Sequence, residues 1–334
     1  MANELHYQIK PFAKPSNIRA LLQLGNTLLP FIGLIIGMYF MILFNVPYIF
    51  IVLISIVPAL FLVRLFIIFH DCTHKSFFTS NKAMIILGHI LGILTFTPFY
   101  KWQRDHIIHH RTVGHLEKRG IGDVWMMTTE EYQEASLIRK IKYRIYRNPF
   151  ILFFVGPIFL FLIGQRFPTT NTKKVWFSTM ITNIGIVAII LAVSFTVGFR
   201  YYLLIQLPII FFAAIIGVWL FYIQHQYEDV YWEHTMRWKS QNAALEGSSV
   251  YRLPVILEWF TGAIGYHNVH HLNPRVPNYR LKKAYLSIPD LQKGYIVTFF
   301  RSFKLSLLCF YDEKKKIMIS YRQYKKLKKL QTSQ

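Results

Sequence analysis

The sequence has few acidic residues and few cysteines. Only 16 aspartates and glutamates stand against 38 lysines and arginines in 334 residues, a formal net charge of +22. The two cysteines, Cys72 and Cys309, cannot form a disulfide framework, and reduced thiols suit the cytoplasmic side of a membrane. The chain also lacks a phosphate-binding glycine motif and a serine-hydrolase motif, so neither chemistry competes for the function.

Charged residues are nearly absent from four long apolar stretches. A helix of about 20 residues, rising about 1.5 Å per residue, spans a hydrocarbon core of about 30 Å. No early cleavable apolar segment precedes these stretches, so we predict no signal peptide. We predict four transmembrane helices in two hairpins, at residues 28–44, 47–69, 175–197 and 201–223.

Basic residues indicate the side of the membrane on which the connecting segments lie. The link at 45–46 has no lysine or arginine, whereas 101–149 carries ten and 224–334 carries eighteen. By the positive-inside rule, both long segments and both termini are predicted to be cytoplasmic, in a multi-pass protein of the cell membrane. The expected fold is an all-α membrane protein, a single domain over 1–334, with a cytoplasmic helical cap.

The densest basic run is the tail, residues 312–334. Apolar side chains recur there at helical spacing, at Ile317, Tyr321, Tyr324 and Leu327. This pattern favours an interfacial helix on an anionic membrane surface, with a solvated disordered tail as the alternative. Nucleic acid is not expected as a partner, because the rest of the chain is embedded in lipid.

Histidine is concentrated in three short boxes, which read HDCTH at 70–74, HIIHH at 106–110 and HNVHH at 267–271. On a helix, residues i, i+3 and i+4 share one face, so each box can direct two or three imidazoles at one point. We predict metal ligation by the eight box histidines, which are His70, His74, His106, His109, His110, His267, His270 and His271.

The three boxes can share one site only if they lie on one face of the membrane. Two further apolar stretches, 83–100 and 150–164, are therefore predicted to be interfacial or re-entrant, and their glycines and prolines disfavour straight spanning helices. His225 emerges at the cytoplasmic edge after the fourth span and is the ninth predicted ligand. The remaining histidines are not assigned to metal; they are His6, His89, His115 and His234.

Nine imidazoles are too many for one ion, but they suit two metals with four or five ligands each. Imidazole binds zinc, copper, iron and nickel alike, so the ligand type does not identify the metal. A site at the cytoplasmic end of apolar helices can receive an acyl chain from the bilayer. A histidine-lined metal transporter is the non-enzymatic alternative, but its ligands should lie along the membrane interior, where these helices have none.

The order of the boxes and the paired apolar hairpins resemble the integral-membrane fatty acid desaturase family. The flanking stretches at 64–69, 75–78 and 120–125 agree, and the likeness is greatest to acyl-lipid desaturases of the delta-12 and bacterial delta-5 type. No fused cytochrome b5 motif is present. The resemblance therefore implies a separate electron donor, ferredoxin or flavodoxin.

The resemblance also implies a di-iron centre held by the nine histidines, with O2 as co-substrate and no separate catalytic residue. Two hydrogens would leave adjacent methylenes of a membrane-lipid acyl chain, producing a cis double bond. Asp71, Asp105 and Asp123 are candidates to orient imidazoles by bonding to the ring nitrogen that does not bind the metal. Membrane-bound di-iron hydroxylases and ketolases, which act on alkyl or isoprenoid lipids, share the scaffold and remain the alternative, because spacing alone does not separate them.

Overall fold

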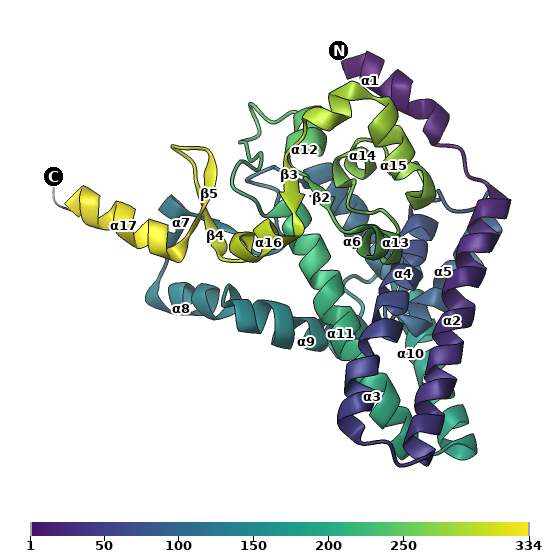
Figure 1. The fold of residues 1–334 in the computed structure, drawn as a ribbon. Coiled ribbons are helices and arrows are strands. Elements are labelled where there is room, and N and C mark those ends of the chain that lie inside the picture. The colour runs from purple at the N-terminus through teal and green to yellow at the C-terminus, as the bar shows by residue number, and fades with distance from the viewer. Residues whose placement is uncertain (1, 333–334) are drawn as a thin grey trace.

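The computed structural model describes residues 2–332, which form a mostly helical protein. Long helices pack together, and shorter elements lie across one end of them (Figure 1). Four segments are long and apolar enough to cross a membrane, as the sequence predicts. They are α2 (Asn17–Leu43), α3 (Tyr48–Ile54) continued by α4 (Ile56–Thr73), α10 (Lys173–Thr196) and α11 (Phe199–His225).

The first two spans differ in detail from the prediction. Helix α2 begins at Asn17 rather than at residue 28, because the side chain of Ser16 caps it by accepting the backbone N–H of Arg19 at 3.5 Å. The second span is interrupted at Ser55, whose hydroxyl donates to the carbonyl of Val52 at 2.6 Å. A hydroxyl that bonds to the backbone of its own helix commonly bends that helix.

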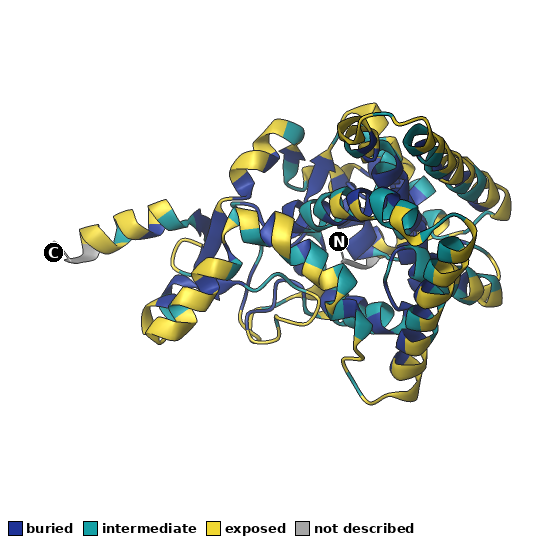
Figure 2. Ribbon diagram, turned by 90° about the horizontal axis from the view of Figure 1, so that it is seen from below, coloured by how far each residue is buried: buried dark blue, intermediate teal, exposed yellow. Residues whose placement is uncertain are grey.

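Helix α4 is the centre of the membrane region. In the apolar part of the segment Tyr48–Thr73, which α4 dominates, 61% of the residues are buried, compared with 17% in α2, 17% in α10 and 28% in α11. Both α2 and α11 pack directly against it. The outward faces of the long helices are exposed (Figure 2), which is the arrangement expected where lipid covers them. The end of α4 therefore projects His70 from the middle of the molecule.

Helices α5 (Asn81–Leu94) and α6 (Phe99–Thr112) form a bent pair that meets at 100°. The chain turns at Phe96, where φ is 56°, and the N–H of Thr97 donates to the carbonyl of Gly92 at 2.7 Å. A Cβ on Gly92 would approach the Thr97 carbonyl oxygen to 2.5 Å, so only glycine permits this reversal.

Helix α5, which covers most of the stretch 83–100, packs along α4 and α10. The turn at Phe96 redirects α6 toward the end of α4 and so keeps the second histidine box beside the first.

A second bent pair follows, with an angle of 62°. Helix α8 (Leu137–Tyr146) leads into a π-helical turn (Ile151–Val155), and α9 (Gly156–Leu162) packs against α11. The predicted stretch 150–164 coincides with this turn and α9. Helix α8 carries an exposed apolar face that sequence analysis did not identify; it consists of Leu137, Ile138, Ile141 and Ile145.

The fold is mostly helical, as predicted, and the cap also contains five short strands. A three-stranded sheet has the order β1-β4-β5, with β1 parallel to β4 and β4 antiparallel to β5, and a second sheet pairs β2 with β3 in parallel. The strands are β1 (Met127–Thr128), β2 (Val250–Arg252), β3 (Ile296–Thr298), β4 (Leu308–Asp312) and β5 (Ile317–Ser320). The short helices are α1 (Ala2–Ile9), α7 (Thr129–Glu134), α12 (Ser240–Glu246), α13 (Val255–Phe260), α14 (His267–Leu272), α15 (Asn278–Ser287) and α16 (Phe299–Leu305).

The four apolar residues of the tail do not all lie on one helix, contrary to the predicted helical spacing from Ile317 to Leu327. Ile317 lies in β5, and α17 (Tyr321–Thr332) begins only after that strand and extends away from the rest of the chain (Figure 2). Tyr324 is 6% exposed, with its ring 4.9 Å from Phe310 and 5.4 Å from Tyr132 between centroids. The aromatic face assigned to lipid therefore packs on the protein, because the β4–β5 hairpin offers it a buried surface.

Candidate metal centre

Four helices deliver histidines to one place. Helix α4 carries His70 and is capped by His74, α6 carries the second box, and α14 is the third box. Helix α11 ends at His225. The structure brings all nine predicted histidines together, although His109 and His225 are 116 residues apart along the chain and His70 and His270 are 200 apart.

Five of the histidines form one group. Their potential ligand atoms all lie within 4.8 Å of one another, and the members are His70, His74, His106, His110 and His270. The Nε2 atom of His70 is 3.1 Å from that of His106 and 3.0 Å from that of His270. Among these five, only His74 and His110 are partly exposed.

The other four histidines form a second group. His109, His225 and His271 are buried, with ligand atoms within 4.8 Å of one another. His267 joins them, since its Nε2 lies 3.0 Å from that of His225 and 3.2 Å from that of His271. His225, the ninth predicted ligand, thus lies within the second group, between His109 and His267.

Contacts to Nδ1 of three histidine rings leave Nε2 of each ring facing the other histidines. The Nδ1 atoms of His70, His109 and His225 lie 3.1 Å from Asp71, 2.5 Å from Asp123 and 3.0 Å from the Gly247 carbonyl. A ring that donates through Nδ1 keeps a lone pair on Nε2. In His109 and His225 both rings do so, and their Nε2 atoms lie 3.1 Å apart, where facing lone pairs repel each other unless a cation lies between them. Imidazole nitrogens gathered in two groups are a donor set that fits metal ions.

Burial also keeps the third box in the form that binds metal. It lowers the pKa values of His267, His270 and His271 well below the ordinary histidine range. These imidazoles are therefore neutral at pH 7, as ligation requires.

Asp105, the third predicted aspartate, is bonded to Arg104. Its carboxylate pairs with Arg104 at 2.7 Å, and within residues 2–332 it makes no hydrogen bond to a histidine. Arg104 is the adjacent cation, while His106 is covered by the Trp102 ring, 4.2 Å away between centroids. Asp71 and Asp123, by contrast, contact histidines as predicted.

An apolar cavity of about 710 Å³ leads to the histidines. His70, His106 and His267 line one part of it, while Ile210, Ala214 and Gly217 of α11 line another. Its volume lies in the range of sites for small organic ligands. Sequence analysis missed these wall residues, because nothing in the pattern of a spanning helix marks the face that borders a cavity.

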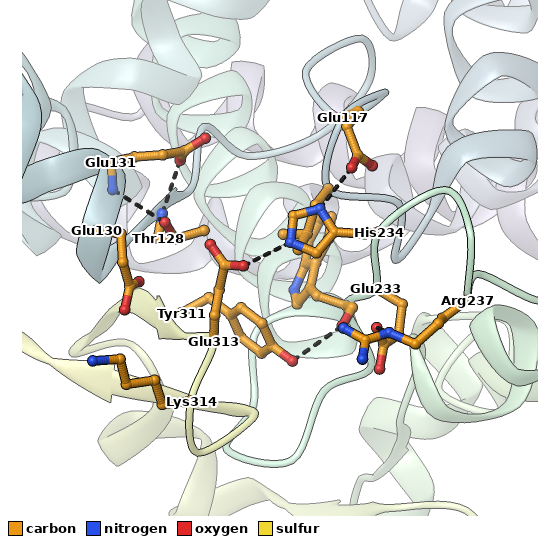
Figure 3. A network of polar contacts seen from close by, with 12 residues as sticks. Glu117, Thr128, Glu130, Glu131, Glu233, His234, Arg237, Tyr311, Glu313 and Lys314 are labelled. Atoms are coloured by element: carbon orange, nitrogen blue, oxygen red, sulfur yellow. Dashed lines mark hydrogen bonds and ion pairs between the residues drawn. The ribbon is translucent and has the colours of Figure 1, made fainter.

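His234, one of the histidines not assigned to metal, lies in a separate network of polar contacts (Figure 3). His234 is placed between two carboxylates, with Nδ1 2.6 Å from Glu117 and Nε2 2.7 Å from Glu313. Those bonds raise the pKa of His234, and the bond from His234 lowers the pKa of Glu117 to about 2. His115 lies beside them, with Nδ1 3.2 Å from Glu117.

The class of protein follows from comparison with known proteins. A family model described as fatty acid desaturase matches residues 45–302, more than half of the chain. The chain therefore belongs to the fatty acid desaturase family, and it is an oxidoreductase. This confirms the resemblance inferred from the histidine boxes.

Individual relatives agree with this class. The chain is 44% identical over 323 residues to a fatty acid desaturase of Bacillus subtilis, covering 96% of this chain and 91% of the relative. It is 25% identical over 234 residues to an sn-1 oleoyl-lipid 12-desaturase of Synechocystis, covering 67% and 64%. It is also 25% identical over 248 residues to an sn-1 acyl-lipid omega-3 desaturase (ferredoxin) of Nostoc, covering 69% and 65%.

Proposed function

We propose that the protein inserts a cis double bond into the acyl chain of a membrane lipid at a di-iron centre held by nine histidines. The observation that carries the proposal is the apolar cavity that ends at His70, His106 and His267. An acyl chain in this cavity would have its methylenes beside the histidine cluster. The two groups, of five and four histidines, are each large enough for one iron.

The proposed reaction consumes one O2 and two electrons for each double bond formed in the acyl chain. The group –CH2–CH2– with O2, two electrons and two protons gives –CH=CH– and two waters. Two bound irons would supply the O2 activation that cleavage of unactivated C–H bonds requires.

The residues of the chain supply positioning and a dry environment. The apolar walls, including Phe66 and Leu160, hold the acyl chain and exclude water. Asp71 and Asp123 keep a proton on Nδ1 of His70 and His109, so that each Nε2 faces the metal.

We further propose that a separate carrier, ferredoxin or flavodoxin, delivers the electrons on the cytoplasmic side. The Nostoc relative is named for ferredoxin, which supports this choice. The excess of basic residues in 101–149 and 224–334 supports a cytoplasmic cap. An acidic carrier would be attracted to so basic a protein.

The test is fatty acid profiling of membranes from a host that expresses the full chain. We expect acyl chains that have lost two hydrogens, with the double bond located by fragmentation of a derivative. Products that instead carry an added oxygen would identify a hydroxylase and overturn the proposal. The distribution of the new double bond between phospholipid and coenzyme A fractions would test the lipid-linked substrate.

A further inference from the structure

A chain of hydrogen bonds runs from His70 to the first spanning helix. Asp71 Oδ1 contacts His70 Nδ1 at 3.1 Å. The other oxygen, Asp71 Oδ2, accepts two bonds from Asn278, from the backbone N–H at 2.6 Å and from Nδ2 at 2.9 Å. Asn278 Oδ1 in turn accepts from Nε2 of Gln23 at 2.8 Å. The chain therefore joins α4, the first residue of α15, and α2.

Each link orients the next one. Because Asn278 Oδ1 accepts from Gln23, the donor Nδ2 must face Asp71, so Gln23 determines which way the amide points. Two donors on Asp71 Oδ2 direct its other oxygen at His70. All four side chains are nearly inaccessible, with exposures of 4% for His70, 1% for Asp71, 2% for Asn278 and 5% for Gln23. Water therefore cannot replace a lost partner.

We propose that Asn278 and Gln23 are positioning residues for the metal centre. They hold the Asp71 carboxylate on Nδ1 of His70, so that Nε2 of His70 keeps its lone pair toward the other histidines. This inference rests on the proposed metal centre. It adds two residues that lie outside the three boxes. Asn278 is 207 residues from Asp71, and Gln23 is 255 residues from Asn278.

The location of Gln23 supports a specific role. It lies on the buried stripe of α2 together with Ala20 and Thr27, where Thr27 contacts Nε of Arg64 at 3.1 Å. A polar side chain in a membrane helix is costly unless a partner satisfies it. Among the described residues, the one hydrogen bond from the Gln23 side chain goes to Asn278. The spanning helix α2 is thereby coupled to a ligand of the centre.

Metal titration separates a positioning role from simple packing. The full chain is purified in lipid nanodiscs, stripped with a chelator and titrated with Co2+, whose absorption reports each histidine site. We expect two equivalents in the unaltered protein. Asn278→Asp keeps the acceptor for Gln23 but places a second carboxylate against Asp71. We expect one equivalent to weaken by about 10–100-fold while the other is unchanged.

Gln23→Leu should weaken the same equivalent to a smaller extent, and it decides the question if Asn278→Asp does not fold, because it leaves α15 unaltered. The matched control is Asn183→Asp. Asn183 is a partly buried asparagine of α10 that bonds to Arg166 at 2.9 Å, away from the histidines. Both equivalents should bind normally in this variant.

The other outcomes overturn the inference in distinguishable ways. Unchanged binding of both equivalents in Asn278→Asp and Gln23→Leu would show that the bonds do not position His70. Equal weakening of both equivalents would show a general packing defect. Failure of the unaltered protein to bind two equivalents would overturn the proposed metal centre, and the inference with it.

Discussion

Two regions of this molecule contain histidines bonded to carboxylates, but the consequences are opposite. In the metal centre, His70 and His109 each contact one buried aspartate through Nδ1, and the Nε2 atoms point at other histidines. At the surface, His234 is 47% exposed and contacts a carboxylate through each nitrogen. The two rings in the metal centre are placed to present a nitrogen to a cation, whereas the His234 ring lies between two carboxylates, which raise its pKa.

The presence of a histidine at a sequence position does not determine whether its ring binds a metal or carries a proton. The ring is the same, and the partner on its second nitrogen decides its chemistry. A metal on that nitrogen requires a lone pair, whereas a carboxylate there favours a proton. The following changes test this contrast, from the largest expected effect to the smallest.

Replacing one histidine in each region should give the largest difference in activity between two variants. His109→Ala removes a buried imidazole from the second group, and we expect double-bond formation to fall by at least about 100-fold, beyond the usual effect of losing an outer partner. His234→Ala, the same substitution in the surface network, should retain most of the activity. Lipid profiles normalised to the amount of membrane-inserted protein measure both. Comparable activities in the two variants would contradict the assignment of His109.

Metal removal should affect only the buried region. We expect about two irons per chain in the purified protein, and a chelator should remove them and lower the melting temperature, since the metal binds the folded state. Fe2+ should restore both iron content and activity, whereas Mg2+, which prefers oxygen ligands, should restore neither. A stoichiometry of one zinc would contradict the di-iron proposal. His234→Ala should bind the same amount of iron as the unaltered chain.

Asp123 and Asp105 should differ in their effect on metal affinity. Asp123→Asn removes the charge beside Nδ1 of His109, and metal affinity should fall by about 10–100-fold. Asp105→Asn is the matched control on α6, because Asp105 pairs with Arg104 instead of a histidine. Its metal affinity should stay within a factor of about 3, below the range for an outer partner. Isothermal metal competition measures both, and a larger loss in Asp105→Asn would reverse the two roles.

The surface bridge should add a small, pH-dependent stability. The raised pKa of His234 means that its contribution is complete at acidic pH and is lost as the pH rises through that raised value. Glu117, whose pKa is lowered to about 2, contributes above its ordinary value near 4.5 and loses its contribution as the pH falls toward 2. The bridge is therefore strongest between these limits. His234→Gln should lower the melting temperature there by about 1–2 °C, as expected of an exposed pair, and by nothing at alkaline pH.

Much of the membrane region could be predicted from the sequence, because length and hydropathy are local properties. The four spans, the clustering of the boxes and the proximity of His225 all follow from apolar runs and the requirement for a shared face. The early start of α2 could not be predicted in the same way. Its first three turns are polar along one side, and only packing against the cap explains Gln23 there.

The features that sequence reasoning missed depend on contacts between distant residues. The tail was assigned to lipid because Tyr324 recurs at helical spacing, but a β-hairpin buries its ring. Asp105 was chosen for adjacency to His106, but Arg104 is as close in sequence and takes the carboxylate. Asn278 has no local signal, since its partner Asp71 lies 207 residues away.

The distance along the chain between the boxes has a consequence for biogenesis. His70 and His270 meet across 200 residues, so the five-histidine group is incomplete until most of the polypeptide has been made. At about 5–20 residues per second, the ribosome needs roughly 10–40 s to cover that interval. The two hairpins would thus enter the bilayer before the centre is complete, and the proposed metal ions would be loaded after insertion, into a site that the last third of the chain closes.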